Sequence, residues 1–434
     1  MNSEQVVCSD CLEHMKTMPE NSVDSIVTDP PYGLSFMNKE WDSFGTDTRQ
    51  PGDEHYWVPD NPYGRSKARY GWNQDKSKLA ASNRAFQESM TYVFEEALRV
   101  AKPGAHLLCF GGTRTFHRMA CAIEDAGWEI RDCVMWVYGS GFPKSMDVAK
   151  AIDKATGYVG EVIGERTVDV GMQGGHMHAG RKSQQQQQVR SLSDQAKKWD
   201  GWGTCLKPAW EPIIVARKPL DGTVASNVLK WGVGAMNIDA CRVPTEDNLN
   251  GGAHSKNGGR TSLPGDERTA AGMGMFAPGA RCKEDYKQPT GRFPANLVHD
   301  GSQMVLDLFP DTGKSSGGGN GKRAASGGVY GQYAPKDYPQ NVGLGDQGSA
   351  ARFFYCAKAS KKDRGDGNNH PTVKPTELMK WLVQLVTPEG GVVLDPFAGS
   401  GTTLVACKML GRDCIGIERE QEYVEIIKRR LETT

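Results

Sequence analysis

Hydrophobic positions at the two ends of the chain alternate between strand-like runs and helix-like spacing. Apolar residues recur at helical spacing from Phe86 to Leu98, and Lys102-Pro103-Gly104 is expected to end that helix. Short apolar runs bounded by turn residues indicate buried strands. This alternation predicts an α/β fold with a doubly wound sheet. The predicted strands are 25–28, 106–110, 130–138, 207–218, 391–394 and 413–417, and the further predicted helices are 113–126, 402–410 and 420–431.

The pattern disappears in the middle of the chain, where glycine is concentrated. Residues 251–350 hold 21 of the 52 glycines, and a run such as 317–323 is not expected to pack as a helix or strand, because glycine loses much backbone entropy on folding. The tract Gln184–Gln188 is predicted to be a solvated linker. The middle is therefore an insertion into one sheet. The predicted parts are 1–140 and 352–434 as the two halves of the sheet domain, 141–206 as linker and insertion, 207–218 as a core strand, and 219–350 as a loop-rich region.

Composition and charge exclude several classes of protein. The 434 residues suffice for two or three domains, and 52 basic residues balance 52 acidic ones, so the chain lacks the positive charge of a histone-like binder. No apolar run approaches the ~18 residues of a membrane span, and the first residues lack a secretion signal. The 11 scattered cysteines predict a reduced, intracellular protein. Cys8, Cys11 and His14 have no second pair at zinc-finger spacing, so no metal site is predicted.

One candidate ligand site is the segment 392–403, which has the pattern of a strand, a glycine-punctuated turn and the start of a helix. Glycine lets the backbone approach a bound cofactor closely, and an acid at the end of the following strand can hold ribose hydroxyls. Glu418 lies 23 residues after Asp395, near the ~20 residues typical of dinucleotide-binding proteins. An ordinary tight turn between a strand and a helix would also fit these glycines.

The second candidate is Asp29-Pro30-Pro31-Tyr32, at the carboxyl end of a predicted strand. The two prolines fix φ and remove two backbone donors, so a carboxylate and carbonyl oxygens remain as acceptors. Such acceptors suit the two N–H donors of an exocyclic amino group, and hydrogen bonding to both can free the nitrogen lone pair for attack. Tyr32 offers a flat face on which a base can stack. A simple Asp-Pro-Pro turn would also fit this segment.

Together the two motifs resemble those of the S-adenosylmethionine-dependent DNA amino-methyltransferases. The catalytic motif of that family is (D/N/S)PP(Y/F/W), and its cofactor loop is FxGxG, found here at residues 397–401. The catalytic motif comes first, a long variable region second and the cofactor loop last, which is the order of the β class. The resemblance implies a circularly permuted, Rossmann-like methyltransferase sheet with an inserted target-recognition region, in which residues 1–32 continue the sheet that residues 390–434 begin. Residues 369–375 and Asp10 resemble further motifs of the family.

The resemblance also implies a mechanism for the catalytic motif. Asp29 and the Pro30 carbonyl would hold the amino group of the target base, and Pro31 and Tyr32 would complete the site. The amino nitrogen would attack the sulfonium methyl group in line, and a proton would leave afterwards. Catalysis would then consist mainly of positioning and electrostatic stabilisation.

A second set of residues is implied as the site of S-adenosylmethionine. Asp10 and Glu418 would hold its adenine and ribose ends, and the loop 395–403 its methionine part, whose carboxylate Thr372 and Lys374 would help to bind. Asp10 could instead cap a helix, and Lys374 could be an exposed, solvated lysine. The complete predicted cofactor set is Asp10, Cys11, His370, Thr372, Lys374, Asp395, Pro396, Phe397, Gly399, Ser400, Gly401, Thr402, Thr403 and Glu418.

Binding of double-stranded DNA is expected to involve base flipping, because an amino group inside a duplex is out of reach of an active site. Tyr32 is the first candidate for stacking on the flipped base. Residues 60–84 interleave basic and aromatic side chains, which suits a DNA-facing loop as well as a solvated one. Position in the family's order makes 219–350 the target-recognition domain, without predicting which bases it reads. The other predicted DNA contacts are Phe36, Trp41, Arg65, Lys67 and Arg69.

The resemblance favours adenine as the methylated base. Asp29 at the first motif position with Tyr32 at the fourth goes mostly with N6-adenine, whereas serine at the first position goes mostly with N4-cytosine. Methylation of RNA or of protein glutamine uses similar chemistry, but there asparagine usually replaces Asp29 and the cofactor loop usually comes first. A DNA-binding module without chemistry would need a broken motif, and both motifs are intact. The family further suggests a homodimer, located in the cytoplasm with the nucleoid.

Overall fold

A computed structural model gives the fold of the chain. It describes residues 4–33, 76–143, 145–158, 162–170, 182–189, 192–247, 249, 289–313, 322–323, 326–328, 331–333, 336–337, 347–358, 360, 363–365 and 367–434. The chain divides into two compact units. The first comprises Met1–Met236, Asn296–Ser302 and Ala357–Thr434, and the second comprises Asn237–Ala295 and Gln303–Cys356.

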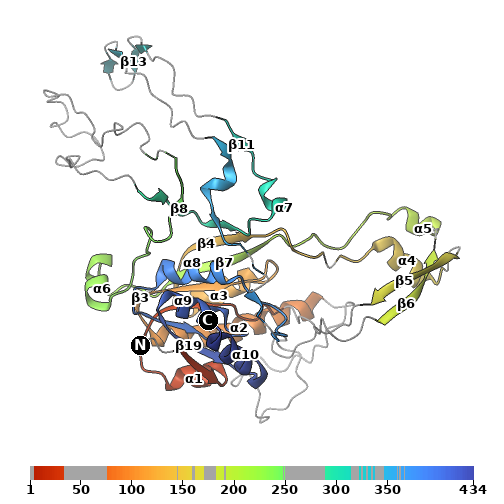
Figure 1. The fold of residues 1–434 in the computed structure, drawn as a ribbon, viewed down its shortest axis with the longest axis horizontal. Coiled ribbons are helices and arrows are strands. Elements are labelled where there is room, and N and C mark those ends of the chain that lie inside the picture. Colours follow the sequence, from red (N-terminus) through yellow and green to blue (C-terminus); the bar gives the residue numbers. More distant parts are fainter. Residues whose placement is uncertain are drawn as a thin grey trace. The chain divides into compact units, whose positions relative to one another are not determined.

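The first unit is built around a mostly parallel sheet (Figure 1). Its strands follow the order β1-β19-β18-β2-β3-β7-β4-β10, and β7 runs antiparallel to both of its neighbours. All six residues of β2 are buried, as expected of a strand covered on both faces. The strands are β1 (Glu4–Cys8), β2 (Val23–Thr28), β3 (Ala101–Phe110), β4 (Glu129–Val137), β7 (Trp210–Arg217), β10 (Leu297–His299), β18 (Val392–Asp395) and β19 (Asp413–Glu418).

Helices pack on both faces of this sheet, which is the doubly wound arrangement predicted from the sequence. Side chains of the first three helices share one hydrophobic cluster with Ile26, Leu107 and Leu394 of the strands. Further along the chain, α8 contacts β2 and β3, while α9 contacts β18 and β19. The helices of this unit are α1 (Cys11–Thr17), α2 (Lys76–Val100), α3 (Phe116–Asp125), α4 (Val148–Thr156), α5 (Asp194–Lys197), α6 (Val224–Trp231), α8 (Thr376–Val386), α9 (Thr402–Leu410) and α10 (Gln421–Glu432).

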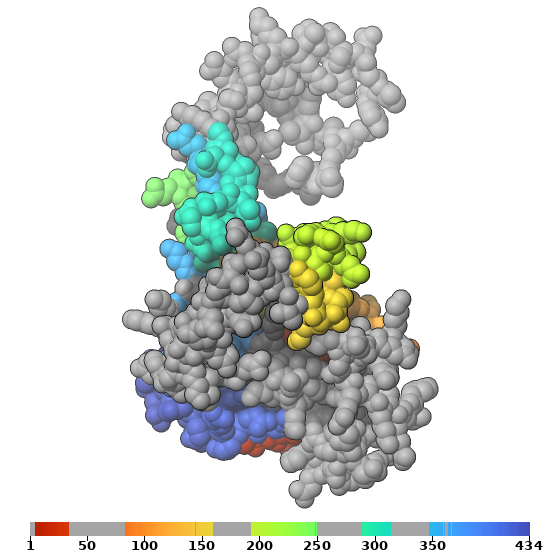
Figure 2. All heavy atoms as spheres, turned by 90° about the vertical axis from the view of Figure 1, so that its right-hand side faces the viewer, coloured from red at the N-terminus to blue at the C-terminus, as the bar shows by residue number. Residues whose placement is uncertain are grey.

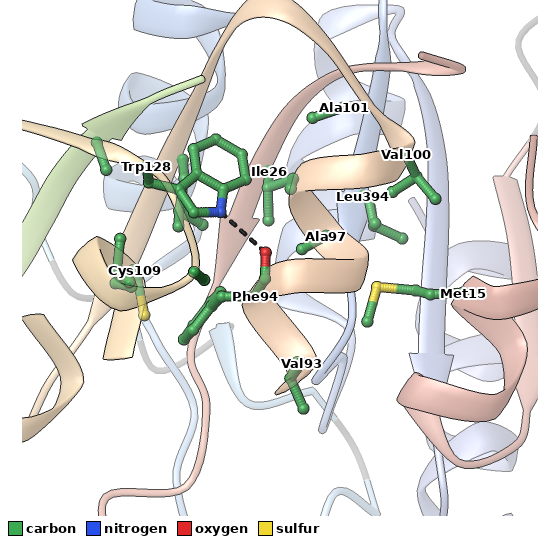
Figure 3. Packing of buried hydrophobic residues seen from close by; sticks show 14 of the residues in the cluster. Met15, Ile26, Val93, Phe94, Ala97, Val100, Ala101, Cys109, Trp128 and Leu394 are labelled. Atoms are coloured by element: carbon green, nitrogen blue, oxygen red, sulfur yellow. Dashed lines mark hydrogen bonds between the residues drawn. The ribbon is translucent and has the colours of Figure 1, made fainter. Parts of the chain in front are cut away.

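The cluster joins elements that are far apart in the sequence. Figure 3 shows Met15 of α1 and Leu394 of β18 in this cluster together with Val93, Ala97 and Val100 of α2. The indole N–H of Trp128 donates to the carbonyl oxygen of Phe94 at 3.0 Å, so this buried polar atom has a partner. Each large apolar side chain buried here contributes about 1.5–3 kcal/mol. This packing holds the strands whose ends form the site described below.

The sheet confirms the predicted circular permutation. The N-terminal strand β1 pairs in parallel with β19, close to the C-terminus, and β2 pairs in parallel with β18. Figure 2 shows the red N-terminal and the blue C-terminal atoms lying together. The first and last parts of the chain therefore form one continuous sheet, as residues 1–32 and 390–434 were predicted to do.

The boundary between α2 and β3 differs from the prediction. Lys102-Pro103-Gly104 does not separate a helix from a strand that starts at His106, because α2 ends at Val100 and β3 already begins at Ala101. Ala101 pairs with Val23 of β2, and the next paired residues are Ser25 and His106. The proline thus lies in a bulge of the strand, where its missing N–H costs no ladder hydrogen bond.

The glutamine tract is not a solvated linker. It forms most of β6 (Lys182–Val189), which pairs antiparallel with β5 (Val162–Val170). Backbone pairing does not depend on apolar side chains, and β5 supplies the valines and the threonine that favour a strand. The segment 141–206 also carries α4 and α5, whose ends are joined by the Ser193 hydroxyl donating to Asp153 at 2.6 Å. The described residues of 141–206, predicted to be linker and insertion, therefore include helices and a strand pair.

The second unit begins later than the expected boundary at residue 219. The helix α6 belongs to the first unit, because the buried Asn227 side chain donates to the carbonyl oxygens of Pro103 at 2.9 Å and Val233 at 2.7 Å. The strand β10, inside the predicted insertion, pairs in parallel with β4 of the main sheet. Long-range contacts, one made by a side chain and one by backbone pairing, decide both differences, and hydrophobic periodicity does not predict such contacts.

The second unit consists of short elements around a charged centre. Asp247 accepts from Arg292 at 2.6 Å and lies 3.5 Å from Arg352, and both guanidinium groups stack on Phe353. The run 317–323 was not expected to form a strand, but its last two residues, Lys322 and Arg323, form β12 and pair with β15. Backbone pairing requires no side chain, so a short strand pair can form even there. The elements are β8 (Val243–Pro244), β9 (Gly291–Arg292), α7 (Gln303–Leu306), β11 (Asp311–Thr312), β12 (Lys322–Arg323), β13 (Ser326–Gly328), β14 (Gly331–Tyr333), β15 (Lys336–Asp337), β16 (Gly348–Ser349), a 3₁₀ helix (Ala350–Phe353) and β17 (Tyr355–Cys356).

Candidate active site

The two predicted motifs meet at one edge of the sheet. Because β2, β18 and β19 are parallel, their carboxyl ends lie side by side, and open α/β sheets bind ligands at that edge. The Thr28 hydroxyl at the end of β2 donates to Asp395 at the end of β18, at 2.7 Å. Residues 29–32 and 395–403 are therefore neighbours in space.

The catalytic motif holds a compact group of polar atoms. The Tyr32 hydroxyl donates to Asp29 Oδ1 at 2.9 Å, and Lys374 Nζ lies 2.7 Å from Asp29 Oδ2. The Lys374 ammonium also lies 3.2 Å from the Tyr32 hydroxyl oxygen and 4.7 Å from the centre of the Phe110 ring. Lys374 is only 8% exposed. The alternative interpretation from the sequence, an exposed and solvated lysine, is therefore wrong.

Two carboxylates stabilise the buried charge of Lys374. Burial by itself disfavours the ammonium ion, but Asp29 and Glu211 outweigh that cost and raise the pKa of Lys374 above its usual value. Burial and then the charges of the same two carboxylates raise the pKa of Tyr32 well above its usual value. Lys374 therefore stays charged, and Tyr32 stays a hydroxyl donor.

Glu211 and Tyr138 belong to this group, and the sequence analysis missed both. Glu211 Oε2 lies 3.1 Å from the Tyr32 hydroxyl, as a second acceptor that shares its one hydrogen with Asp29, and 3.2 Å from Lys374 Nζ, while Oε1 accepts from the Tyr138 hydroxyl at 3.2 Å. Glu211 is the second residue of β7, whose antiparallel direction brings its start to the edge where β3 and β4 end. A carboxylate at the start of an otherwise apolar strand was the available signal.

The cofactor loop has the backbone geometry that only glycine adopts readily. Gly399 has a φ of 54° and Gly401 a φ of 79°, both in the left-handed region. A Cβ atom on Gly401 would lie 2.8 Å from Ile427 of α10, and one on Gly399 would lie 3.2 Å from His370 Nε2. Two tight backbone approaches, rather than one ordinary turn, explain why glycine occurs at both positions.

Two carboxylates flank this loop, the buried Asp395 and the half-buried Glu418. Glu418 Oε2 accepts from the Gly399 N–H at 2.8 Å, and Asp395 Oδ2 accepts from the Thr403 hydroxyl at 2.5 Å. Burial raises the pKa of Asp395 to about 6 and that of Glu418 to about 7, although hydrogen bonds to both carboxylates oppose the shift. Both groups would gain from a nearby positive charge.

The other predicted cofactor residues surround the loop in different ways. Asp10 caps α1, accepting from the Leu12 N–H at 2.9 Å, and the Ser9 N–H donates to the Glu418 carbonyl oxygen, so this turn lies beside the end of β19. Burial lowers the pKa of His370 to about 4, which keeps the ring neutral. Cys11 and Pro396 are buried, Phe397 is half-buried, and Thr372 is exposed.

Arg430 of α10 contacts the cofactor loop, and the sequence analysis did not identify it. Its guanidinium group donates to the Ser400 carbonyl oxygen at 2.6 Å and to the Thr402 hydroxyl at 3.1 Å. The side chains of Ser400 and Thr402 thus contact the interior of the protein. Only the packing of α10 against the loop reveals the partners of this arginine.

Several predictions lie outside the described residues. Phe36, Trp41, Arg65, Lys67 and Arg69 fall in the segment 34–75, of which nothing structural is described. Within the described ranges, no three His, Cys, Asp or Glu side chains cluster in a way that could hold a metal ion. None of the described helices is long and apolar enough to cross a membrane.

Comparisons with known proteins place this arrangement among DNA methylases. Residues 23–429 match the model of the N6/N4 DNA methylase family. The type II methyltransferase M.HindIII of Haemophilus influenzae is 23% identical over 98% of this chain and 93% of its own length. The type II methyltransferase M2.DpnII of Streptococcus pneumoniae is 41% identical over 20% of this chain and 32% of its own. The solved M1.HpyAVI–SAM complex is 14% identical, covers 99% of both chains and has a TM-score of 0.37.

Proposed function

The chain belongs to the N6/N4 DNA methylase family, whose members use S-adenosylmethionine, and from this premise we propose that it methylates the N6 amino group of adenine at a specific site in duplex DNA. Its membership confirms the family predicted from the two motifs, and the chain is a DNA methyltransferase. The adenine target and the residue roles below are the proposal.

The observation that carries the proposal is the junction of the two motifs through Thr28 and Asp395. It puts the acceptors of residues 29–32 beside the glycine loop 395–403, so a base amino group and a methyl donor can meet at one sheet edge. Bound S-adenosylmethionine supplies an electrophilic methyl group on a cationic sulfur. The site fits such a ligand, because the carboxylate of Asp395 is buried, that of Glu418 is half-buried beside the loop, and the loop glycines allow close backbone approach.

The chain's own residues would position the reacting amino group. Asp29 and the Pro30 carbonyl oxygen accept its two N–H bonds, which draws the nitrogen lone pair out of conjugation with the ring. The Tyr32 ring supports the flipped base by stacking. Base flipping costs a few kcal/mol, and contacts between the base and the site offset that cost. After transfer, the nitrogen loses one proton. No covalent enzyme intermediate is needed, so positioning and electrostatics supply the rate enhancement.

Adenine is favoured over cytosine by the identity of the motif. Asp29 in the first position and Tyr32 in the fourth are the pair typical of N6-adenine enzymes in this family. The same geometry would serve an N4 amino group of cytosine, which is the alternative. Methylation of RNA or of protein glutamine fits less well, because asparagine would be expected in place of Asp29.

The test is to express the protein in a host without DNA methylation and to sequence single molecules of its DNA, with mass spectrometry of the nucleosides. We expect N6-methyladenine in one fixed sequence context. N4-methylcytosine would contradict the choice of base and keep the enzyme class. A host DNA without modified bases, from cells that contain folded protein, would contradict the proposal.

The affinity for S-adenosylmethionine is expected to decrease as the pH falls below about 7. The pKa of Glu418 is about 7 in the free protein because the side chain is buried. The proposed contact with ribose hydroxyls uses the ionised carboxylate, so the bound state holds this pKa lower. The affinity therefore rises with pH up to about 7 and is constant above that pH. Below pH 7 the affinity can change by at most about tenfold per pH unit, because one proton is involved.

Titration calorimetry between about pH 5.5 and 8.5 would measure this dependence. Glu418→Gln should bind more weakly and lose the inflection near pH 7, while Glu425→Gln, at an exposed position of α10, should keep it. A wild-type affinity that is constant over this range would contradict the role of Glu418.

Recognition of DNA would fall to segments outside the sheet. We assign target recognition to the loop-rich region 219–350 on the basis of the family's order, and DNA contacts to the residues before α2 because basic and aromatic side chains alternate there. Activity on DNA inside the cell implies a location in the cytoplasm with the nucleoid. A homodimer follows from the same resemblance, and light scattering that gave a monomer mass would contradict it.

A further inference from the structure

Glu211 occupies a place in the active site that neither motif assigns. It comes from β7, and its side chain is 20% exposed. One carboxylate oxygen receives the Tyr138 hydroxyl, and the other receives both the Tyr32 hydroxyl and the Lys374 ammonium group. Tyr32 and Lys374 are the same two groups that contact Asp29.

Each oxygen of Asp29 already has a donor in this arrangement. Oδ1 accepts from Tyr32 at 2.9 Å, and Oδ2 pairs with Lys374 at 2.7 Å. To accept an N–H bond from the target base, Asp29 must share one of these oxygens with the new donor or release the old one. Either change weakens the interaction of Asp29 with a present partner, and a buried ammonium ion that lacks compensating charge is strongly destabilising, so a second carboxylate beside Lys374 is needed.

We propose that Glu211 is a positioning residue that holds Lys374 and Tyr32 in place while Asp29 accepts from the amino group of the target base. Its distances to Lys374 and Tyr32, 3.2 Å and 3.1 Å, are longer than those of Asp29. These contacts can shorten when the base binds to Asp29. Tyr138 fixes the carboxylate through its other oxygen. The inference rests on the proposed function in requiring an amino-group substrate, and it holds for adenine and cytosine alike.

The charges around Lys374 provide a specific readout. The ammonium group faces Asp29 and Tyr32 after β2, Tyr138 after β4 and Glu211 on β7, with His370 in its own loop and the Phe110 ring from β3. Asp29 and Glu211 are the two groups that raise the pKa of Lys374 against its burial. Removing one carboxylate therefore brings the loss of this proton to a lower pH.

The experiment compares wild-type protein with Glu211→Gln, which keeps the size of the side chain and removes its charge. Transfer of tritiated methyl groups to DNA from a methylation-free host is measured across pH. We expect kcat to fall about 10- to 100-fold, with the Kd for S-adenosylmethionine changed less than about threefold. A decline of kcat/KM should also appear above about pH 9.5, where an ordinary lysine begins to lose its proton. Glu129→Gln, which removes the partner of Arg217 at the far end of β7, should behave as wild type.

Tyr138→Phe provides a second test that leaves both carboxylates in place. It frees Glu211 Oε1, and kcat should fall about two- to fivefold without the new alkaline decline, the loss expected for one hydrogen bond. Wild-type kcat and pH profile in both variants would overturn the role of Glu211. If Glu211→Gln does not fold, Tyr138→Phe alone decides. An inactive wild-type protein would instead contradict the proposed function, so the two failures are distinguishable.

Discussion

Replacing Asp29 with alanine is expected to reduce methyl transfer to DNA by about 100- to 1,000-fold or more, while S-adenosylmethionine binding changes less than about threefold. The variant removes the carboxylate that accepts from the base amino group in the proposed mechanism. The glycine loop 395–403 and Glu418 belong to other strands and keep their own contacts. Single-turnover transfer and calorimetric binding, measured on the same preparation, would separate the two effects.

Asp29→Asn is the matched variant for this prediction. An asparagine keeps one acceptor oxygen but not the charge that pairs with Lys374 at 2.7 Å, so Lys374 would rely on Glu211 alone. We expect its activity to lie between those of wild type and Asp29→Ala. Turnover retained in Asp29→Ala would rule out the assigned role, and a parallel loss of cofactor binding would indicate damage to the sheet edge instead.

Gly401→Val is expected to abolish S-adenosylmethionine binding and to lower the free energy of unfolding by about 2–5 kcal/mol. The residue has a φ of 79°, which a β-branched side chain rarely adopts, and a Cβ atom there would lie 2.8 Å from Ile427. Since Gly401 is the residue before α9, any shift would also move the loop that approaches the cofactor. Urea denaturation and calorimetry would measure both effects.

Gly390→Ala is the control for this variant. Gly390 has a similar φ of 69°, but no atom lies within 4 Å of the Cβ position, so only the backbone cost of about 1 kcal/mol remains. It lies in the turn before β18, at the opposite edge of the sheet from the loop. Normal cofactor binding by a folded Gly401→Val protein would contradict the requirement for glycine at this position.

The arrangement at the sheet edge links stability and function. Asp395 at the end of β18 is buried, and its two oxygens accept from Thr28 of β2 and Thr403 of α9. Burial raises its pKa to about 6, and no positive charge among the described residues nearby opposes that shift. Arg430 tightens the same loop from below through Ser400 and Thr402. The protein therefore maintains a site that holds uncompensated negative charge where a cationic cofactor is proposed to bind.

The sequence by itself determined the fold class, the permuted order, the family and the two motifs. These features are local, because a buried strand, a proline pair or a glycine turn can be recognised from neighbouring residues. Even so, local reasoning failed where backbone pairing overrode side-chain preference. The glutamine tract joins β5 in a hairpin, and Pro103 lies within the bulge of β3.

Only the tertiary structure decided which side chains meet at the site. Tyr32 and Glu211 are 179 residues apart, and Tyr32 and Lys374 are 342 apart. Their contact depends on the antiparallel direction of β7 and on the loop before α8, and the sequence near these residues does not show which of them meet. Lys374 is predicted to help bind the cofactor, and only the fold shows that its partners within the chain are Asp29 and Glu211, which supply the opposite charge that a buried ammonium ion needs.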